Sequence, residues 1–196
     1  MIVHLAGAPG SGKTTLAKQV SKPNWDIYDL DDVNREFVEG NHLIPLTRSN
    51  PQKVVEMYQE HIASIVQKAR NNGKNIIFLG INAGLLGSPV GENMIDLDAD
   101  YNVLLNVDTA LNAKRWIQRD MPEVLDDFVR SLKDDIQMYD KLEKKGRQLK
   151  KDFADLIRDF RPSQRKDDIQ RFKKFYLKRG FTAMSPERFV QWFERL

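Results

Sequence analysis

The sequence predicts an α/β fold in which a parallel sheet is covered by helices. Short apolar runs alternate along the chain with longer segments whose apolar residues recur every three or four positions, which is typical of strands alternating with amphipathic helices. The run over residues 75–79 is almost continuously apolar, as expected of a strand buried on both faces. With 196 residues, the chain is long enough for one well-buried domain and a small appended subdomain.

The first strand is expected over Ile2–Ala6, and it leads into a glycine-rich loop followed by a helix. The loop has the spacing G-x-x-x-x-G-K-T, in which consecutive backbone N–H groups and the positive end of the helix can point at an anion. Lys13 can then reach the β- and γ-phosphates of a nucleotide, and the Thr14 hydroxyl can bind Mg²⁺. The residues expected to contact the nucleotide are Gly7, Ala8, Pro9, Gly10, Ser11, Gly12, Lys13, Thr14 and Thr15.

The alternative interpretation of this loop is a glycine-rich turn with a solvated lysine. The phosphate-binding interpretation is favoured because the strand before the motif and the helix after it are both present. We therefore expect ATP as the bound nucleoside triphosphate, with Mg²⁺ carried in by it.

A second strand over residues 25–28 ends in three carboxylates, Asp29, Asp31 and Asp32. The carboxyl ends of parallel strands form the ligand crevice of such sheets, so these acids are expected near the phosphate-binding loop. Three neighbouring carboxylates repel one another unless a cation or a donor-rich substrate lies between them. The alternative interpretation is that Asp31 or Asp32 caps the next helix, and the two roles are compatible.

That helix is expected from near Val33 to Gly40, with a loop over residues 45–51 after it. A longer helix follows, with a core-facing apolar stripe that begins at Val54 and a left-handed cap signal at residues 71–73.

The strand over residues 75–79 opens into the glycine-rich stretch 80–84. Glycines at a strand end allow the close approach of a substrate, although the stretch could equally be a plain turn. Gly80 and Asn82 are the candidate substrate contacts here.

A loop over residues 85–100 precedes a fourth strand, which is expected over residues 101–107 and ends at Asp108. The next segment, 109–120, reads as a helix that carries Arg115 and Arg119 one turn apart on one face. A solvent-exposed helix surface would also explain these arginines.

Pro122 fits the first position of a further helix, with Asp120 or Met121 as its cap. Apolar residues keep helical spacing over residues 122–160, and a break near residues 144–146 predicts two antiparallel helices.

The chain resumes with Arg165-Lys166-Asp167-Asp168 and a helix to about Arg179. A short extended piece over residues 181–184 precedes a last helix that begins at Ser185, with serine as cap and proline after it. The apolar face of this last helix predicts a docked C-terminus.

The composition is that of a soluble globular protein, with 41% hydrophobic and 30% charged residues, and we expect it in the cytoplasm without a membrane span. The chain has no cysteine, and its three histidines lack the spacing of a zinc site. Residues 1–113 carry a net charge of −4 and residues 114–196 carry +7. The basic half is expected to face an anion, either ATP or a nucleic acid, although a solvated helical face would also explain it.

The chain resembles the small phosphate-loop kinases, meaning the adenylate, shikimate and polynucleotide kinase group. The resemblance lies in the phosphate-binding loop, the stretch Asp108–Arg119 and the Arg165–Asp168 string. It implies a three-layer P-loop NTPase fold similar to that of nucleoside monophosphate kinases, with residues 1–119 and 165–196 as the core and residues 120–164 as a helical lid. It also implies that Arg115, Arg119 and Arg165 contact ATP, with Arg119 and Arg165 among the catalytic residues together with Lys13.

The acceptor side departs from adenylate kinases, because no acidic residue ends the strand over residues 75–79. Asp29 and Asp31 resemble the Asp-x-Asp of shikimate kinases, whereas Asp32 and Arg35 have the Asp-x-x-Arg spacing of polynucleotide kinases and zeta-type toxins. Adenylate kinases carry the same Asp-x-x-Arg spacing, so it does not decide the acceptor.

Chemistry favours a hydroxyl acceptor, because a hydroxyl gains from a general base and a phosphate acceptor does not need one. Asp31, or failing that Asp32, is the expected base, Arg35 the expected contact of a substrate anion, and Asp31 a second candidate Mg²⁺ ligand. The expected substrate contacts are Asp29, Asp31, Arg35, Gly80 and Asn82.

The leading hypothesis is an ATP-dependent kinase that acts on a hydroxyl of a small molecule, a nucleoside or a nucleic-acid 5′ end. One alternative is a nucleoside monophosphate kinase in which Arg35 binds the monophosphate. The other is a nucleotide switch, or an NTPase stimulated by nucleic acid, whose basic helices form the partner surface.

Overall fold

The computed structural model describes residues 1–80, 95–136, 151, 154–155 and 161–196. It contains a five-stranded parallel sheet in the order β2-β3-β1-β4-β5. The strands are β1 (Ile2–Ala6), β2 (Trp25–Asp29), β3 (Asn75–Leu79), β4 (Tyr101–Leu105) and β5 (Thr182–Met184). The described helices are α1 (Lys13–Val20), α2 (Leu30–Gly40), α3 (Ile44–Ser49), α4 (Pro51–Asn71), α5 (Thr109–Ile136), α7 (Pro162–Leu177) and α8 (Pro186–Phe193). The predicted α/β class with a parallel sheet is confirmed.

The chain divides into two compact units. The first unit consists of residues 1–8, 12–106 and 173–196, and the second of residues 9–11 and 107–172. The sheet lies in the first unit, whereas α5 lies in the second. The assignment of residues 120–164 to a lid stays a prediction.

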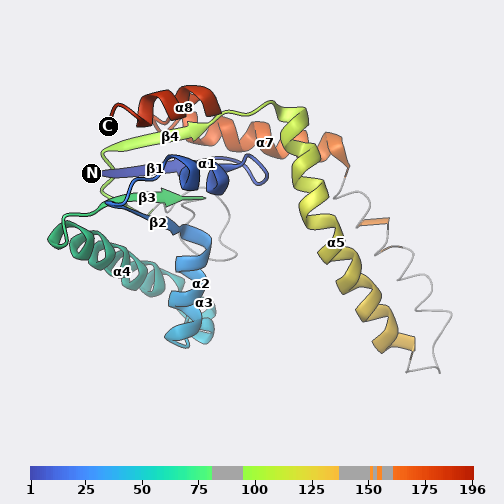
Figure 1. Cartoon of the computed structure of the whole chain (residues 1–196). Helices are drawn as coiled ribbons and strands as arrows, with labels where there is room; N and C mark the ends of the chain where they lie inside the picture. The colour runs from blue at the N-terminus through green and yellow to red at the C-terminus, as the bar shows by residue number, and fades with distance from the viewer. Residues whose placement is uncertain (81–94, 137–150, 152–153, 156–160) are drawn as a thin grey trace. The chain divides into compact units, whose positions relative to one another are not determined.

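The sheet of the first unit is covered by helices on both faces (Figure 1). On one face, Ile2, Ile76 and Phe78 pack against the apolar sides of α2 and α4 in one buried cluster. On the other face, α1 and α8 pack together, and the Trp25 ring lies 4.6 Å from the ring of Phe193, measured between centroids. Burial on both faces explains why β1 and β3 are continuously apolar, apart from His4 and Asn75.

The start of α2 differs from the prediction. The helix begins at Leu30 rather than near Val33, because the side chain of Asp29 accepts a hydrogen bond from the backbone N–H of Asp31 at 3.1 Å and caps the helix. The prediction that Asp31 or Asp32 is the cap is therefore wrong. Both residues lie in the first turn of α2, where carboxylates are stabilised by the positive end of the helix.

The predicted loop over residues 45–51 is wrong as well, because α3 occupies most of it. Pro45 stands in the first turn of α3 and Pro51 in the first turn of α4, where the missing N–H of proline costs no helical hydrogen bond. Asn50 lies between the two helices and caps α4 by accepting from the Lys53 N–H at 3.2 Å. The cap predicted after α4 is confirmed, with Gly73 at φ +64°.

In the second unit, α5 runs through Pro122 instead of ending before it. Asp120, one of the two predicted caps, accepts a hydrogen bond from the indole N–H of Trp116 at 2.6 Å, so its carboxylate is engaged with the preceding turn. The helix continues despite the hydrogen bond that proline removes. The predicted break near residues 144–146 lies outside the described residues.

The last two strands differ in detail from the prediction. Strand β4 ends at Leu105 rather than at residue 107, and Asp108 caps α5 by accepting from the Leu111 N–H at 2.8 Å. The short extended piece near the C-terminus is a fifth strand that pairs with β4 in parallel. The docked C-terminus is confirmed, because Phe189 and Phe193 of α8 are fully buried and Ser185 caps the helix.

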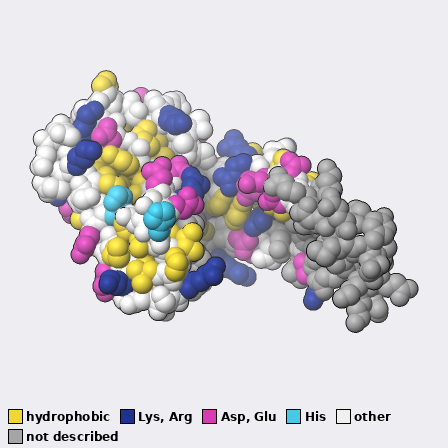
Figure 2. All heavy atoms as spheres, turned by 90° about the horizontal axis from the view of Figure 1, so that it is seen from below, with side chains coloured by type: hydrophobic (Ala, Val, Ile, Leu, Met, Phe, Trp, Pro, Cys, Tyr) yellow, Lys and Arg dark blue, Asp and Glu magenta, His cyan; other side chains and the backbone are white. Residues whose placement is uncertain are grey.

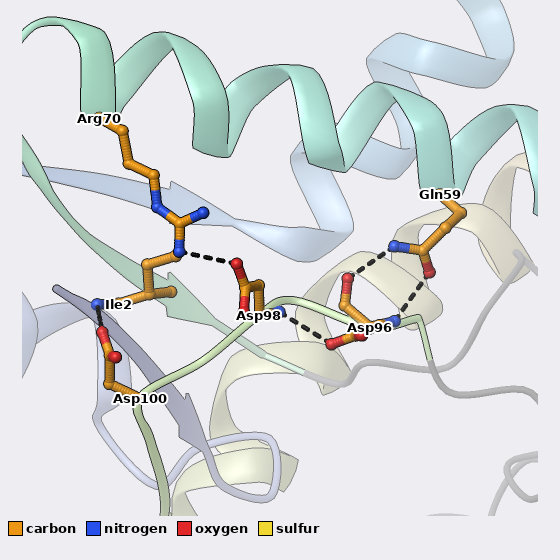
Figure 3. A network of polar contacts seen from close by, with 6 residues as sticks. All are labelled: Ile2, Gln59, Arg70, Asp96, Asp98 and Asp100. Carbon is orange, nitrogen blue, oxygen red and sulfur yellow. Dashed lines mark hydrogen bonds and ion pairs between the residues drawn. The ribbon is translucent and has the colours of Figure 1, made fainter.

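The irregular segment before β4 is attached to α4 and β1 by side chains (Figure 3). Gln59 of α4 donates to the carbonyl of Asp96 at 2.7 Å and accepts from its N–H at 2.8 Å. Arg70 pairs with Asp98 at 2.7 Å, and Asp100 accepts from the backbone N–H of Ile2 at 2.6 Å. These contacts fix the point at which the chain enters β4.

Within the described part of the chain, no helix combines the length and the apolar character needed to cross a bilayer.

His4 is a buried polar residue in the centre of the sheet. Its side chain is 1% exposed, and its Nε2 lies 3.2 Å from the carbonyl oxygen of Gly80. Burial lowers the pKa of His4 from 6.5 to about 4, although the hydrogen bonds to Gly80 and Asn102 act in the opposite direction. The imidazole is therefore neutral at pH 7, with Nε2–H donating to Gly80.

This pKa predicts a pH-dependent stability. The pKa of His4 is lower in the folded than in the unfolded protein, so its contribution is fully present above pH 6.5 and is lost as the pH falls toward 4. Between pH 8 and pH 5, we expect wild type to lose on the order of 2 kcal/mol more unfolding free energy than His4→Gln, measured by urea denaturation. Exposed His42→Asn is the matched control, and equal pH slopes for all three proteins would contradict the prediction.

Candidate functional site

The lysine of the glycine-rich loop lies over the loop's own backbone, an arrangement that we call the lysine cradle. Lys13 Nζ donates to the carbonyl of Gly7 at 2.7 Å and to that of Ala8 at 3.3 Å. The side chain is half-buried, so its charge is held at the carboxyl end of β1. A cation in this place can bind a phosphate group that reaches the loop.

The N-terminus of α1 adds donors beside this cation. Gly12 is the N-cap and provides no side-chain cap, and the first turn contains no acidic residue. The first N–H groups of α1 are thus available to an anion, together with the positive end of the helix. Thr14 and Thr15 are exposed in this turn, and their hydroxyls are available to a metal ion or to a phosphate.

The other part of the loop, residues 9–11, belongs to the second unit and packs closely there. Gly10 has φ +77°, and a Cβ atom at this position would lie 2.8 Å from the backbone nitrogen of Trp116 and 3.1 Å from Asn112 Oδ1. Glycine is therefore required by both conformation and space. Ser11 Oγ and Asn112 Oδ1 are buried and have no hydrogen-bond partner among the described residues.

Three carboxylates stand at the N-terminus of α2. Asp29 is half-buried and makes the cap, whereas Asp31 and Asp32 are exposed. Asp32 forms an ion pair with Arg35 one turn later, and the two side chains are 58% and 55% exposed. The role of these carboxylates in a substrate site stays a prediction. Figure 2 shows acidic side chains gathered next to histidines and apolar side chains on one face of the first unit.

Gly80, at the end of β3, lies beside this acidic group. It has φ +105°, and a Cβ atom there would lie 3.5 Å from Asp29 Oδ1. Its N–H donates to the Leu5 carbonyl at 3.3 Å, and its own carbonyl accepts from His4. Gly80 is thus fixed between β1 and the acids of α2. Asn82, the other predicted contact of this stretch, lies outside the described residues.

Two buried polar residues lie behind the acids. The pKa of Tyr58 is raised to about 12, mainly by burial and to a smaller extent by the charge of Asp31, although a hydrogen bond to Asn34 acts in the opposite direction. The Tyr58 hydroxyl lies 3.5 Å from the Leu30 carbonyl. Asn34 is 6% exposed, and its Oδ1 has no partner within the described chain. The helical spacing of Tyr58 indicated only a core position.

The predicted arginines lie in the second unit. Arg119 pairs with Asp120 at 2.5 Å and is 60% exposed, and Arg115 is exposed on the same helix. Arg165 is 18% exposed, with its guanidinium over the Trp116 ring. The unit therefore places Arg119 and Arg165 around Trp116 and Asp120.

Sequence reasoning missed three residues that lie against the site glycines: His4 beside Gly80 in the first unit, and Asn112 and Trp116 beside Gly10 in the second. The available signal for His4 was that it is a polar residue inside an otherwise apolar strand. Asn112 and Trp116 lie close to Arg115 in sequence, within the stretch Asp108–Arg119 that resembles the small kinases. Their spacing does not show that they face residues 9–11.

The parallel sheet, the loop between β1 and α1 and the lysine cradle define a P-loop nucleotide-binding protein. Residues 3–152 match a family model, AAA_18, which is described as an AAA domain. The match covers well over half of the chain, so the protein belongs to this family. A comparison with curated proteins finds no match.

The packing of Gly10 predicts the effect of adding one methyl group. We expect Gly10→Ala to weaken MgATP binding by about 10-fold or more, equivalent to 1.4 kcal/mol, because the loop must move away from Trp116. The measurement is titration calorimetry with MgATP.

Gly73→Ala is the matched control, since Gly73 also has positive φ but open space around it. It should destabilise the protein slightly and leave the ATP affinity unchanged. Equal affinities of the two variants for MgATP would contradict the importance of this contact.

Proposed function

We propose that the protein is an ATP-dependent kinase that transfers the γ-phosphoryl group of ATP to a hydroxyl of a small molecule, a nucleoside or a nucleic-acid 5′ end. The observation that carries the proposal is the acidic N-terminus of α2 at the same sheet edge as the Lys13 cradle. β1, β3 and β2 are parallel neighbours in the first unit, so their carboxyl ends lie at the same edge of the sheet. Gly7, Gly80 and Asp29 stand at these three strand ends.

Lys13, the α1 N-terminus and the loop backbone would bind the phosphates of ATP. The donor set fits Mg²⁺ as well, because the exposed Thr14 hydroxyl stands in the first turn of α1 and supplies an oxygen ligand. Bound Mg²⁺ would neutralise charge on the phosphates. Arg115, Arg119 and Arg165 would contact the ATP, with Arg119 and Arg165 at the transferring group.

Asp31 is our first candidate for the general base, and Asp32 is the second. Asp32 forms an ion pair with Arg35 on the same helix. Asp31 has its backbone fixed by the cap at Asp29 and its carboxylate exposed in the first turn. A carboxylate in this position can accept the proton of an attacking hydroxyl. Arg35 is our candidate for the contact of a substrate anion, because its guanidinium has more N–H donors than the contact with Asp32 uses.

The base assignment predicts the effect of two isosteric changes. We expect Asp31→Asn to lower the phosphorylation rate by about 100-fold, because the variant cannot take up the hydroxyl proton, and to leave the MgATP affinity unchanged. Asp32→Asn should have a smaller effect, and Asp26→Asn, on the strand β2 that precedes this helix and paired with Lys74, should have none. Near-normal rates for both Asp31→Asn and Asp32→Asn would rule out the assignment.

The kinase activity itself is tested with labelled ATP and a panel of nucleosides, nucleotides, sugars and 5′-hydroxyl oligonucleotides. Label on a hydroxyl compound supports the proposal, and label on a monophosphate indicates a nucleoside monophosphate kinase instead. ATP hydrolysis that nucleic acid stimulates without a phosphorylated product would overturn the kinase proposal in favour of an NTPase.

A further inference from the structure

Trp116 of α5 makes contacts in three directions inside the second unit. The centre of the Arg165 guanidinium lies 4.3 Å from the centroid of its ring. Its indole N–H donates to Asp120 Oδ2 at 2.6 Å, and its backbone nitrogen lies directly against Gly10 of the loop. One residue therefore touches the loop segment 9–11 with its backbone and an arginine with its side chain.

The hydrogen bond to Asp120 fixes the orientation of the ring. Burial raises the pKa of Asp120, but the hydrogen bond and charge of Arg119, the Trp116 N–H and the charge of Arg165 lower it by more. The carboxylate is thus ionised at neutral pH and can accept the indole N–H as a charge-assisted bond. An indole held in this way cannot turn freely, so the face that it offers to Arg165 is constant.

The ring in turn restrains Arg165. The Arg165 side chain is 18% exposed, and its Nη1 lies 3.8 Å from Asp168 Oδ2, a loose contact compared with the stacking on Trp116. A guanidinium on an aromatic face keeps its plane and its edge donors, because stacking uses the π face and leaves the N–H groups for hydrogen bonds. Planar donors in a fixed place suit the oxygens of a phosphoryl group.

We propose that Trp116 is a positioning residue that holds Arg165 in place for the phosphates of the bound nucleotide. The proposal rests on the kinase activity proposed above, in which Arg165 contacts the transferring phosphoryl group. Trp116 itself does not touch the nucleotide. It orients the arginine relative to residues 9–11, against which its own backbone is packed.

The first test measures the stacking without any activity. The protein has three tryptophans, so ¹⁵N-labelled indoles give three N–H signals, of which Trp116→Phe identifies one. Arg165→Met should shift the Trp116 signal and leave those of Trp25 and Trp192 in place. A Trp116 signal unchanged by Arg165→Met would overturn the proposal.

The second test is a double-mutant cycle on total ATP turnover, whether the phosphoryl group goes to an acceptor or to water. Trp116→Leu should lower kcat by about 100-fold, the effect of misplacing a catalytic group by about 1 Å, with the KM for ATP nearly unchanged. The double variant Trp116→Leu/Arg165→Met should be no slower than Arg165→Met alone. Trp192→Phe is the control for changing a half-buried indole elsewhere and should match wild type.

Two milder variants cover the case in which Trp116→Leu fails to fold. Trp116→Phe keeps a ring but loses the bond to Asp120, and Asp120→Asn keeps the shape but loses the charge. Each should lower kcat less than Trp116→Leu does. Trp116→Phe should have no effect in the Arg165→Met background, whereas Asp120→Asn also removes the charge that pairs with Arg119.

The outcomes separate this proposal from the kinase proposal. Additive losses in the cycle overturn the role of Trp116 and leave the kinase activity standing. A non-additive cycle on ATP hydrolysis, with no acceptor phosphorylated, supports Trp116 and overturns the kinase. Wild-type protein that consumes no ATP overturns both.

Discussion

The parallel pairing of β1 with its neighbours is the constraint on which the candidate site depends. Leu5 pairs with Leu79 of β3, and Leu79 pairs with Asp29 of β2 on its other side. Because the three strands run in one direction, the residues that follow them leave the sheet at one edge. A lysine cradle, a glycine with positive φ and a group of carboxylates thereby come to one part of the first unit from separate parts of the chain. The buried His4 reinforces this arrangement by binding the Gly80 carbonyl across the ladder.

The sequence was sufficient for the fold class because its signals are local. An apolar run such as Asn75–Leu79 is a strand buried on both faces, and the loop motif stands between a strand and a helix as its chemistry requires. Element boundaries were less predictable where one residue has two possible uses. The sequence predicts Asp29 as a substrate contact, and this residue is also a helix cap. Pro122 is typical of a helix start, although α5 continues through it.

The candidate site could be predicted only as far as its residues are close in sequence. Lys13 follows from the loop motif, and the acids of α2 follow from their position after a strand. The contacts between His4 and Gly80 and between Trp116 and Arg165 join residues far apart in sequence, through packing that no spacing rule describes. The small loop residue Gly10 is a related case, because its conformation could be expected from the motif but its contact with α5 could not.

The contact between Gln59 and Asp96 has a consequence for how such a chain can vary in evolution. A carboxamide offers one donor and one acceptor in a plane, as a peptide group does, so the side chain of Gln59 pairs with Asp96 much as a neighbouring strand would. The position at which β4 begins is therefore fixed by contacts with α4 as well as by pairing with β1. Insertions or deletions in the stretch between Gly80 and Ile95 can change its length without changing where β4 begins. An acid at position 59 would keep the acceptor but lose the donor, which would leave the contacts of Arg70 with Asp98 and of Asp100 with Ile2 to fix this point.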